Sequence, residues 1–294
     1  MNKLEVVLKN IADLGEGPIW DSKKSTLYFV DINGCKLCSY NYKNGEYNEI
    51  STPGRIGAAA MCENPDKFIC AVENNLYILN AKSKEFTPSI ENIFDSSDSK
   101  EVRFNDGKCD KNGRFYIGST DFDDKNGNLY RVDKDKNIIV CEEKVACSNG
   151  IAFSGDNKYM YYIDTPSGFL WRYDYDFATG NIENKTALID YRDIKGGFDG
   201  MTIDKDGTLW VAIWGGFAVN RYDAITGKKI DVVEVPAPNV TSCEFGGNNL
   251  NILFITTYGG NDINMRKEYP LAGSLFAVET DGASGLECNK FAFA

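Results

Sequence analysis

The chain has 294 residues, of which 43% are apolar, and its 32 basic and 43 acidic side chains give a formal net charge of −11. This apolar content is enough for a sizeable core, and the acidic balance argues against a nucleic-acid partner, because phosphate binding requires a basic surface. The sequence contains no histidine, which excludes Ser-His and Cys-His nucleophiles, zincin helices and any imidazole base. Catalysis must therefore depend on carboxylates, amides, Lys, Tyr, Cys or a metal ion.

Nine cysteines are scattered along the chain. The one C-x-x-C pair, Cys35 and Cys38, has neither a second pair nor a histidine to complete a zinc site. Most of the nine sit in apolar runs, so we expect buried, reduced thiols. Residues 1–10 lack the apolar stretch of a signal peptide, and no segment approaches the roughly 18 apolar residues of a membrane span. The sequence predicts a cytoplasmic protein without a membrane partner.

One pattern of three strand-like runs recurs six times along the chain. The first run of each copy is small and often begins with glycine; these runs are residues 17–20, 57–61, 107–110, 150–153, 200–203 and 242–245. The second run alternates bulky residues; these runs are residues 26–30, 67–72, 114–118, 159–164, 208–213 and 251–257. The third run has the form Leu-aromatic-x-apolar or close to it; these runs are residues 37–42, 76–80, 129–133, 170–174, 219–223 and 275–279. Turn residues such as Asn44-Gly45 follow several of them.

A more variable fourth run, such as residues 230–235, lies between successive copies. A repeated unit of four strands is typical of a propeller blade. The sequence therefore predicts an all-β fold, a six-bladed β-propeller with four antiparallel strands per blade, as a single domain over residues 1–294. Residues 4–8 occupy the position of a fourth strand before the first copy, so we expect them to help close the ring against the last copy. Whether they or residues 286–293 lie outermost there is left open.

Equivalent positions of the innermost strands of a propeller face one central channel. In five of the six copies the residue that opens the innermost run is Glu16, Asn105, Asn149, Asp199 or Ser242. Four of these five side chains carry a carboxylate or amide oxygen, the ligand type that calcium, magnesium and manganese prefer. A single Asn-Gly or Asp-Gly pair usually forms only a turn, but the repetition in one register favours a cation site on the axis.

Five segments around these positions carry a family resemblance. They are residues 14–20 (LGEGPIW), 103–108 (RFNDGK), 148–153 (SNGIAF), 199–201 (DGM) and 241–247 (TSCEFGG). In residues and in order they resemble the senescence-marker-protein, gluconolactonase and luciferin-regenerating-enzyme family, across essentially the whole chain. The resemblance implies a six-bladed propeller with one divalent ion in its channel and hydrolysis of sugar lactones.

The resemblance also implies roles for single residues. Glu16, Asn149 and Asp199 correspond to the metal ligands, and Asp199 also to the acid/base of the reaction. Ca²⁺ is the first expectation for the ion, with Mg²⁺, Mn²⁺ and Zn²⁺ left open because oxygen ligands do not separate them.

Three further residues correspond to positions that contact the substrate. Arg103 matches the residue that holds substrate oxygens, and Asn105 matches a neighbour of the ion or the substrate. An acidic residue downstream of the arginine motif falls on Asp123. The family often has glutamate at that position, and Asp121 lies two residues away, so the choice between the two aspartates stays open.

The predicted activity is therefore metal-dependent opening of a small-molecule lactone, with an aspartate as acid/base. Two alternatives remain. The same site suits a phosphotriesterase-like hydrolase, and the fold alone also suits a non-catalytic calcium-binding or scaffold propeller. The identity of the lactone and the oligomeric state are left open.

Overall fold

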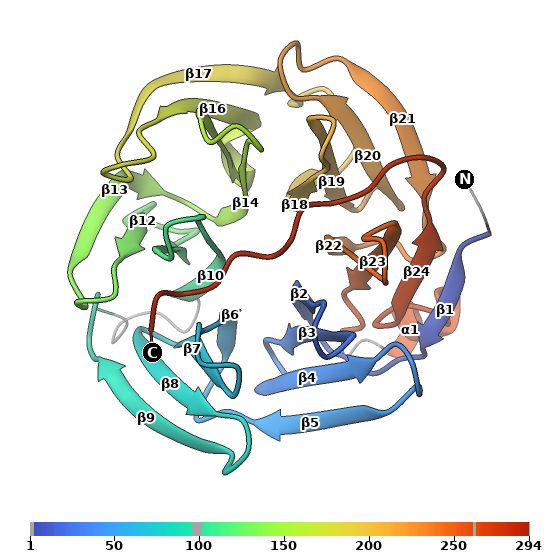
Figure 1. Cartoon of the computed structure of the whole chain (residues 1–294). Coiled ribbons are helices and arrows are strands. Elements are labelled where there is room, and N and C mark those ends of the chain that lie inside the picture. The colour runs from blue at the N-terminus through green and yellow to red at the C-terminus, as the bar shows by residue number, and fades with distance from the viewer. Residues whose placement is uncertain (1–2, 96–101, 261–262, 294) are drawn as a thin grey trace.

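The computed structural model describes residues 3–95, 102–260 and 263–293, and it consists almost entirely of β-strands. The strands form six four-stranded sheets that are arranged as a ring around a central channel (Figure 1). The strand pairs within these sheets are antiparallel. The predicted six-bladed β-propeller is confirmed.

Each blade runs from an innermost strand at the channel to an outermost strand at the rim. Blades 1 to 3 consist of β2 (Gly15–Asp21), β3 (Thr26–Asp31), β4 (Lys36–Asn41) and β5 (Tyr47–Ser51); β6 (Ile56–Met61), β7 (Lys67–Val72), β8 (Asn75–Asn80) and β9 (Glu85–Ile90); and β10 (Arg103–Cys109), β11 (Phe115–Thr120), β12 (Gly127–Val132) and β13 (Ile138–Val145). Blades 4 to 6 consist of β14 (Ser148–Phe153), β15 (Tyr159–Asp164), β16 (Phe169–Tyr175) and β17 (Ile182–Asp190); β18 (Gly197–Ile203), β19 (Thr208–Trp214), β20 (Ala218–Asp223) and β21 (Lys229–Glu234); and β22 (Val240–Gly246), β23 (Ile252–Thr257), β24 (Leu275–Glu279) and β1 (Glu5–Leu8).

Two short helices interrupt the strands of the described segments: the 3-10 helix η1 (Thr165–Ser167) after β15, and α1 (Ile263–Glu268) between β23 and β24. Among the described residues, no helix combines the length and the apolar character needed to cross a membrane.

Blade 6 is built from both ends of the sequence. β1 pairs with β24, with Glu5 opposite Ala277 and Val6 opposite Phe276. The expectation that residues 4–8 help to close the ring is confirmed, and the open question is answered, because β1 is the outermost strand of this blade. Residues 286–293 instead belong to a segment that crosses the ring (Figure 1).

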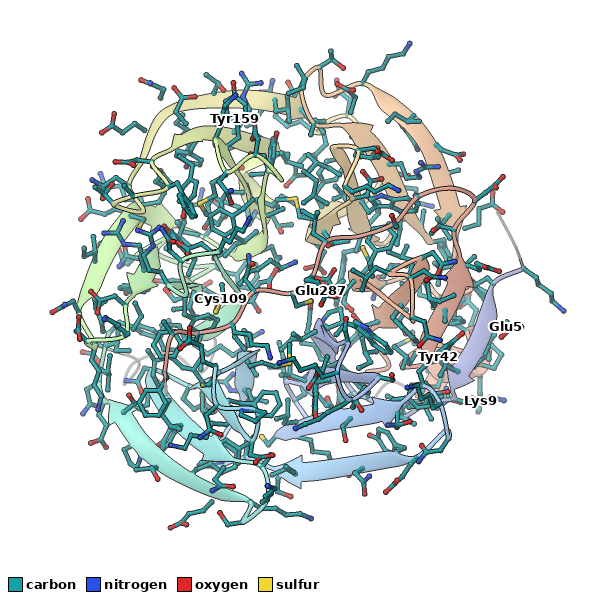
Figure 2. All side chains as sticks on the ribbon, viewed as in Figure 1. Glu5, Lys9, Tyr42, Cys109, Tyr159 and Glu287 are labelled. Atoms are coloured by element: carbon teal, nitrogen blue, oxygen red, sulfur yellow. The ribbon has the colours of Figure 1, made fainter. Side chains whose placement is uncertain are left out.

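This segment, residues 284–293, is the C-terminal strap. It lies at the end of the channel where the innermost strands finish: Gly285 bridges to Asp204 after β18, and Phe291 bridges to Cys62 after β6. In Figure 2, Glu287 of the strap lies near the centre of the ring. The strap therefore covers one end of the channel, and the starts of the innermost strands lie at the other end.

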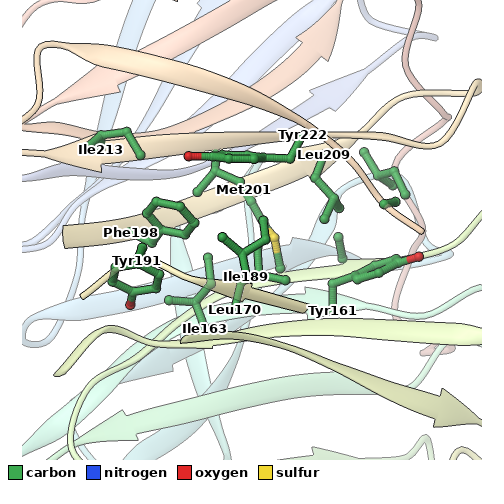
Figure 3. Packing of buried hydrophobic residues seen from close by; sticks show 14 residues of the cluster. Tyr161, Ile163, Leu170, Ile189, Tyr191, Phe198, Met201, Leu209, Ile213 and Tyr222 are labelled. Atoms are coloured by element: carbon green, nitrogen blue, oxygen red, sulfur yellow. The ribbon is translucent and has the colours of Figure 1, made fainter. Parts of the chain in front are cut away.

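Apolar side chains pack between neighbouring blades and hold them together. Figure 3 shows one such cluster, in which Ile163 and Leu170 of blade 4 face Met201 of blade 5. In the same cluster the ring of Tyr191 stacks on that of Phe198, with centroids 3.9 Å apart. Each fully buried side chain of this size contributes about 1.5–3 kcal/mol, so the clusters stabilise the contacts between neighbouring blades.

The nine cysteines are free, and six of them are buried. Burial raises the pKa of every thiol, to about 12 for Cys38 and Cys62 and to about 11 for Cys141. A thiol with a raised pKa holds little of the reactive thiolate near neutral pH. The six buried cysteines therefore act as packing residues, in line with the expectation for most of the nine.

Candidate active site in the central channel

A register shift interrupts the innermost strand of every blade near its start. In β2 the shift lies between Glu16 and Ile19, and in β14 it lies between Asn149 and Ile151. The other four shifts lie at Ile56/Ala58, Phe104/Gly107, Phe198/Met201 and Val240/Ser242. Such bulges leave residues outside the ladder and change the direction of their side chains. The polar residues predicted to converge lie at or within these shifts.

Glycine allows neighbouring blades to approach each other at the same level. A Cβ atom on Gly150 would lie 2.8 Å from the carbonyl oxygen of Asp199, and one on Gly57 would overlap the carbonyl oxygen of Phe104. Gly200 likewise lies beside the backbone of Thr241, so the innermost strands approach each other backbone to backbone at three of the blade interfaces. This close contact accounts for the glycine that begins the first runs at residues 57–61, 150–153 and 200–203.

Glu16 and Asp199 bring two carboxylates into the channel from opposite sides of blade 6. Both side chains are buried, with 6% and 5% of the residue exposed. Burial raises the pKa of each carboxyl group well above its usual value; the charge of Asp106 raises both further, and that of Asp199 also raises the pKa of Glu16. A hydrogen bond between the two carboxyl groups and the backbone N–H of Gly200 partly offset this rise for Asp199. The channel thus concentrates negative charge at this level.

A chain of hydrogen bonds joins the predicted residues of blades 3 and 4. Arg103 Nη1 donates to Asn105 Oδ1 at 2.7 Å, and Asn105 Nδ2 donates to Asn149 Oδ1 at 2.9 Å. The positive charge of Arg103 also lowers the pKa values of Glu16 and Asp199, which places its guanidinium group near both carboxylates. Five of the six predicted site residues therefore meet in one polar centre at the start of the innermost strands.

Asp123 is not part of this centre. It is exposed on the loop after β11 and lines a surface hollow together with Phe94 and Val102, beside the start of β10. The side chain of Asp121 is buried and accepts the backbone N–H groups of Asp124 and Asn126, both at 3.2 Å, so it caps its own turn. Asp121 lines the same hollow, so the role predicted for Asp123 stays a prediction and the choice between the two aspartates stays open.

Between the polar centre and the strap the channel contains a cavity of about 80 Å³. Lys108 Nζ and a carboxylate oxygen of Glu244 form an ion pair there at 3.0 Å, and Glu244 also accepts the hydroxyl proton of Thr202 at 2.7 Å. Sequence reasoning missed this pair. The available signal was a basic residue, Lys108, in one innermost run and an acidic residue, Glu244, in another, since the innermost runs are mostly small or apolar.

The donor atoms of the polar centre fit a hard divalent cation. Among the described residues, no three Cys, Asp or Glu side chains gather into a metal site, so a cation here needs the amide oxygen of Asn149 beside the carboxylates of Glu16 and Asp199. All three donors are oxygens, as calcium, magnesium and manganese prefer. Two buried carboxylates with raised pKa values also favour a cation, because its charge compensates theirs.

The fold and this centre define a class of propeller that carries a buried acid and amide centre in its axial channel. Residues 14–259 match the family model described as the SMP-30/Gluconolactonase/LRE-like region. The chain therefore belongs to the SMP-30/gluconolactonase/LRE-like family, as the resemblance in its motifs predicted.

Several relatives are similar over most of their length. Regucalcin of Xenopus laevis is 33% identical over 298 residues, which cover 99% of this chain and 98% of the relative. YvrE of Bacillus subtilis, a protein provisionally named a sugar lactone lactonase, is 35% identical over 274 residues and 92% of each chain.

Among solved structures, a luciferin-regenerating enzyme superposes with a TM-score of 0.88 at 31% identity and covers 99% of both chains. The calcium-binding protein regucalcin of Agrobacterium tumefaciens superposes with a TM-score of 0.89 at 27% identity and covers 97% of this chain and 96% of its own.

Proposed function

We propose that the protein is a metal-dependent hydrolase that opens sugar lactones at the polar centre of its channel. The observation that carries this proposal is the buried pair of carboxylates, Glu16 and Asp199, beside Asn149 and the Arg103–Asn105 hydrogen bond. Membership of the gluconolactonase-like family and the lactonase name of the Bacillus subtilis relative support the same activity.

In this proposal Glu16, Asn149 and Asp199 hold one divalent ion, with Ca²⁺ first and Mg²⁺, Mn²⁺ or Zn²⁺ as alternatives. A calcium-binding structural neighbour supports the choice of Ca²⁺. When bound, such an ion supplies Lewis acidity, which polarises a carbonyl group and lowers the pKa of water.

Asp199 acts as the base and then as the acid. It accepts a proton from water while the water oxygen attacks the carbonyl carbon of the lactone, and it returns the proton to the ring oxygen when the carbon–oxygen bond breaks. The product is the open hydroxy acid.

Arg103 orients the substrate in this proposal. Its guanidinium group presents several donors in one plane, which suits the hydroxyl and carbonyl oxygens of a sugar lactone. The bond from Nη1 to Asn105 holds one edge of the group in place. Asp123 contacts substrate hydroxyl groups from the rim.

A lactone panel tests the activity. Chelator-treated protein is assayed with a pH indicator on gluconolactone, xylonolactone, galactonolactone and paraoxon, with each divalent ion added back singly. We expect one ion to restore hydrolysis of a sugar lactone. Turnover of paraoxon alone would instead support the phosphotriesterase alternative, and tight Ca²⁺ binding without any turnover would support a calcium-binding propeller, the function named for the Agrobacterium relative.

The variant Asp199→Asn tests the mechanism. It keeps the size of the side chain and one oxygen but removes the base, so we expect kcat to fall at least about 100-fold. The fall must persist at ion concentrations that saturate the variant, as shown by calorimetry. Near-native kcat under those conditions would remove Asp199 from the mechanism.

We also propose a reducing compartment such as the cytoplasm, which suits nine free thiols.

A further inference from the structure

The hydroxyl group of Thr165 lies between one proposed ion ligand and the backbone next to another. Asn149 Nδ2 donates to Thr165 Oγ1 at 2.8 Å, and Thr165 Oγ1 donates to the carbonyl oxygen of Phe198 at 2.6 Å. Asn149 is itself one proposed ligand, and Phe198 directly precedes Asp199, another one. One side chain of blade 4 therefore contacts the ligand of its own blade and the backbone next to the ligand of blade 5.

The directions of these hydrogen bonds are determined by chemistry. A backbone carbonyl can only accept, so the single hydroxyl proton of Thr165 goes to Phe198, and the hydroxyl oxygen must accept from Asn149. The N–H side of the Asn149 carboxamide therefore faces Thr165, and its Oδ1 atom faces the opposite way.

The other end of the chain requires the same orientation. A guanidinium group can only donate, so Arg103 fixes Oδ1 of Asn105 as an acceptor and turns Nδ2 of Asn105 toward Asn149. The oxygen of Asn149 accepts that N–H group. An obligate donor at Arg103 and an obligate acceptor at Phe198 thus leave one arrangement for both amides.

Thr165 is held firmly enough to impose this orientation. It is the first residue of η1 and is followed by Pro166, which restricts the backbone. Its carbonyl oxygen accepts the hydroxyl proton of Tyr191 at 2.8 Å. Its methyl group leaves little room at Gly197, where a Cβ atom would lie 2.9 Å from it.

We propose that Thr165 is a positioning residue of the active site. It turns Oδ1 of Asn149 toward the polar centre and anchors the backbone that carries Asp199, and so it sets the geometry of two ion ligands without touching the ion. The inference rests on the proposed function in that Asn149 and Asp199 are taken as ligands. Groups that orient a ligand in this way typically change ion affinity about 10- to 100-fold when they are removed.

The test compares Thr165→Val with Thr165→Ser by calorimetric titration of chelator-treated protein with Ca²⁺ and with Mn²⁺. Valine keeps the shape but loses both hydrogen bonds, so we expect the Kd for the ion to rise about 10- to 100-fold. Serine keeps the hydroxyl group, and we expect it to stay within about threefold of the native protein. Thr186→Val is the matched control, because Thr186 lies on the outer strand β17 of the same blade and bonds only the carbonyl oxygen of Arg172 in the described contacts; its affinity should not change.

The outcomes separate this inference from the proposed function. If the native protein binds the ion and Thr165→Val binds it equally well, the inference is wrong and the proposed function stands. If the serine variant loses affinity as the valine variant does, the methyl packing and not the hydroxyl group is responsible, and the inference is again wrong. If the native protein binds neither Ca²⁺ nor Mn²⁺, the titration is repeated with Mg²⁺ and Zn²⁺, and failure to bind any of the four ions would overturn both proposals. If Thr165→Val does not fold, Thr165→Ala replaces it. Its ion affinity is compared with that of Thr165→Ser, and the outcomes are read in the same way.

Discussion

The carboxyl group of Asp106 is buried in the channel. Burial raises its pKa, and the charge of Glu244 raises it further, while Lys108 and the N–H group of Gly107 lower it, with a resulting pKa of about 6. The folded protein thus binds a proton at Asp106 more tightly than the unfolded chain does. The free energy of unfolding therefore falls as the pH rises from about 4 to about 6, and it falls no further from this cause above that range.

The variant Asp106→Asn should remove this loss of stability at high pH. We expect chelator-treated Asp106→Asn to melt a few degrees higher than the native protein at pH 8, with the difference shrinking toward zero near pH 4, where the native carboxyl group is itself neutral. Thermal unfolding from pH 4 to pH 8 measures the effect. An equal difference at all pH values would contradict the assigned cause.

At the scale of single residues, the sequence predicted part of the candidate site but not all of it. The repeated register was sufficient to bring Glu16, Asn149 and Asp199 to one axis, because equivalent positions of a propeller share one radius. It could not find Thr165, since that residue lies in η1, outside the repeated strands, and acts through the direction of a hydrogen bond. Such directions follow only from the atoms on both sides.

The turn between β10 and β11 is joined to blade 4 by a buried polar cluster. Arg114 Nε donates to Asp110 Oδ2 at 2.5 Å, and Arg114 Nη2 donates to the hydroxyl oxygen of Tyr175 on β16 at 2.9 Å. The hydroxyl group of Tyr175 in turn donates to Asp110 at 2.7 Å. Asp110 is fully buried, so this element contact depends on each charge having its partner.

The variant Asp110→Ala should lower the free energy of unfolding by about 3–5 kcal/mol, because it leaves Arg114 buried without its carboxylate. Urea unfolding measures the loss. Asp231→Ala is the control, since it breaks the Arg221–Asp231 pair, whose aspartate is about half exposed, and should cost under about 1 kcal/mol. An equal loss of unfolding free energy in both variants would show that the effect does not depend on burial of the cluster.

At the scale of strands, prediction and structure agree closely. The second run at residues 67–72 coincides with β7, because alternating bulky side chains fit a strand that packs on both faces. The register shifts at the start of the innermost strands were not predicted. A bulge depends on how two strands pair, and a run such as residues 148–153 has no local residue pattern that fixes where the pairing slips.

The strap stabilises the whole ring from the end opposite the polar centre. Phe291 is buried in the core cluster that contains Cys62, Cys109 and Phe115, so the strap packs onto blades 2 and 3. Asn289 Nδ2 also donates to the carbonyl oxygen of Cys109 at 3.1 Å. These contacts fasten a segment from the end of the described chain to blades that are formed much earlier in the sequence.

The variant Phe291→Ala should lower the free energy of unfolding by about 3–5 kcal/mol and leave KM for the lactone within about twofold. Denaturant unfolding and steady-state kinetics measure the two effects. Phe177→Ala removes a ring that is 38% exposed and should cost under about 1 kcal/mol. A large rise in KM for Phe291→Ala would mean that the two ends of the channel are coupled.

The sharing of blade 6 between β1 and β24 affects how the protein is made. Among the strands of the described residues, β1 leaves the ribosome first and β24 last, and at about 5–20 residues per second the interval between them is on the order of tens of seconds. Until then the nascent chain is an open arc of blades, and β1 has no partner for its backbone hydrogen bonds. An unpaired strand edge readily pairs with other chains, so the strand that closes the finished ring is also the segment that needs shielding for longest during synthesis.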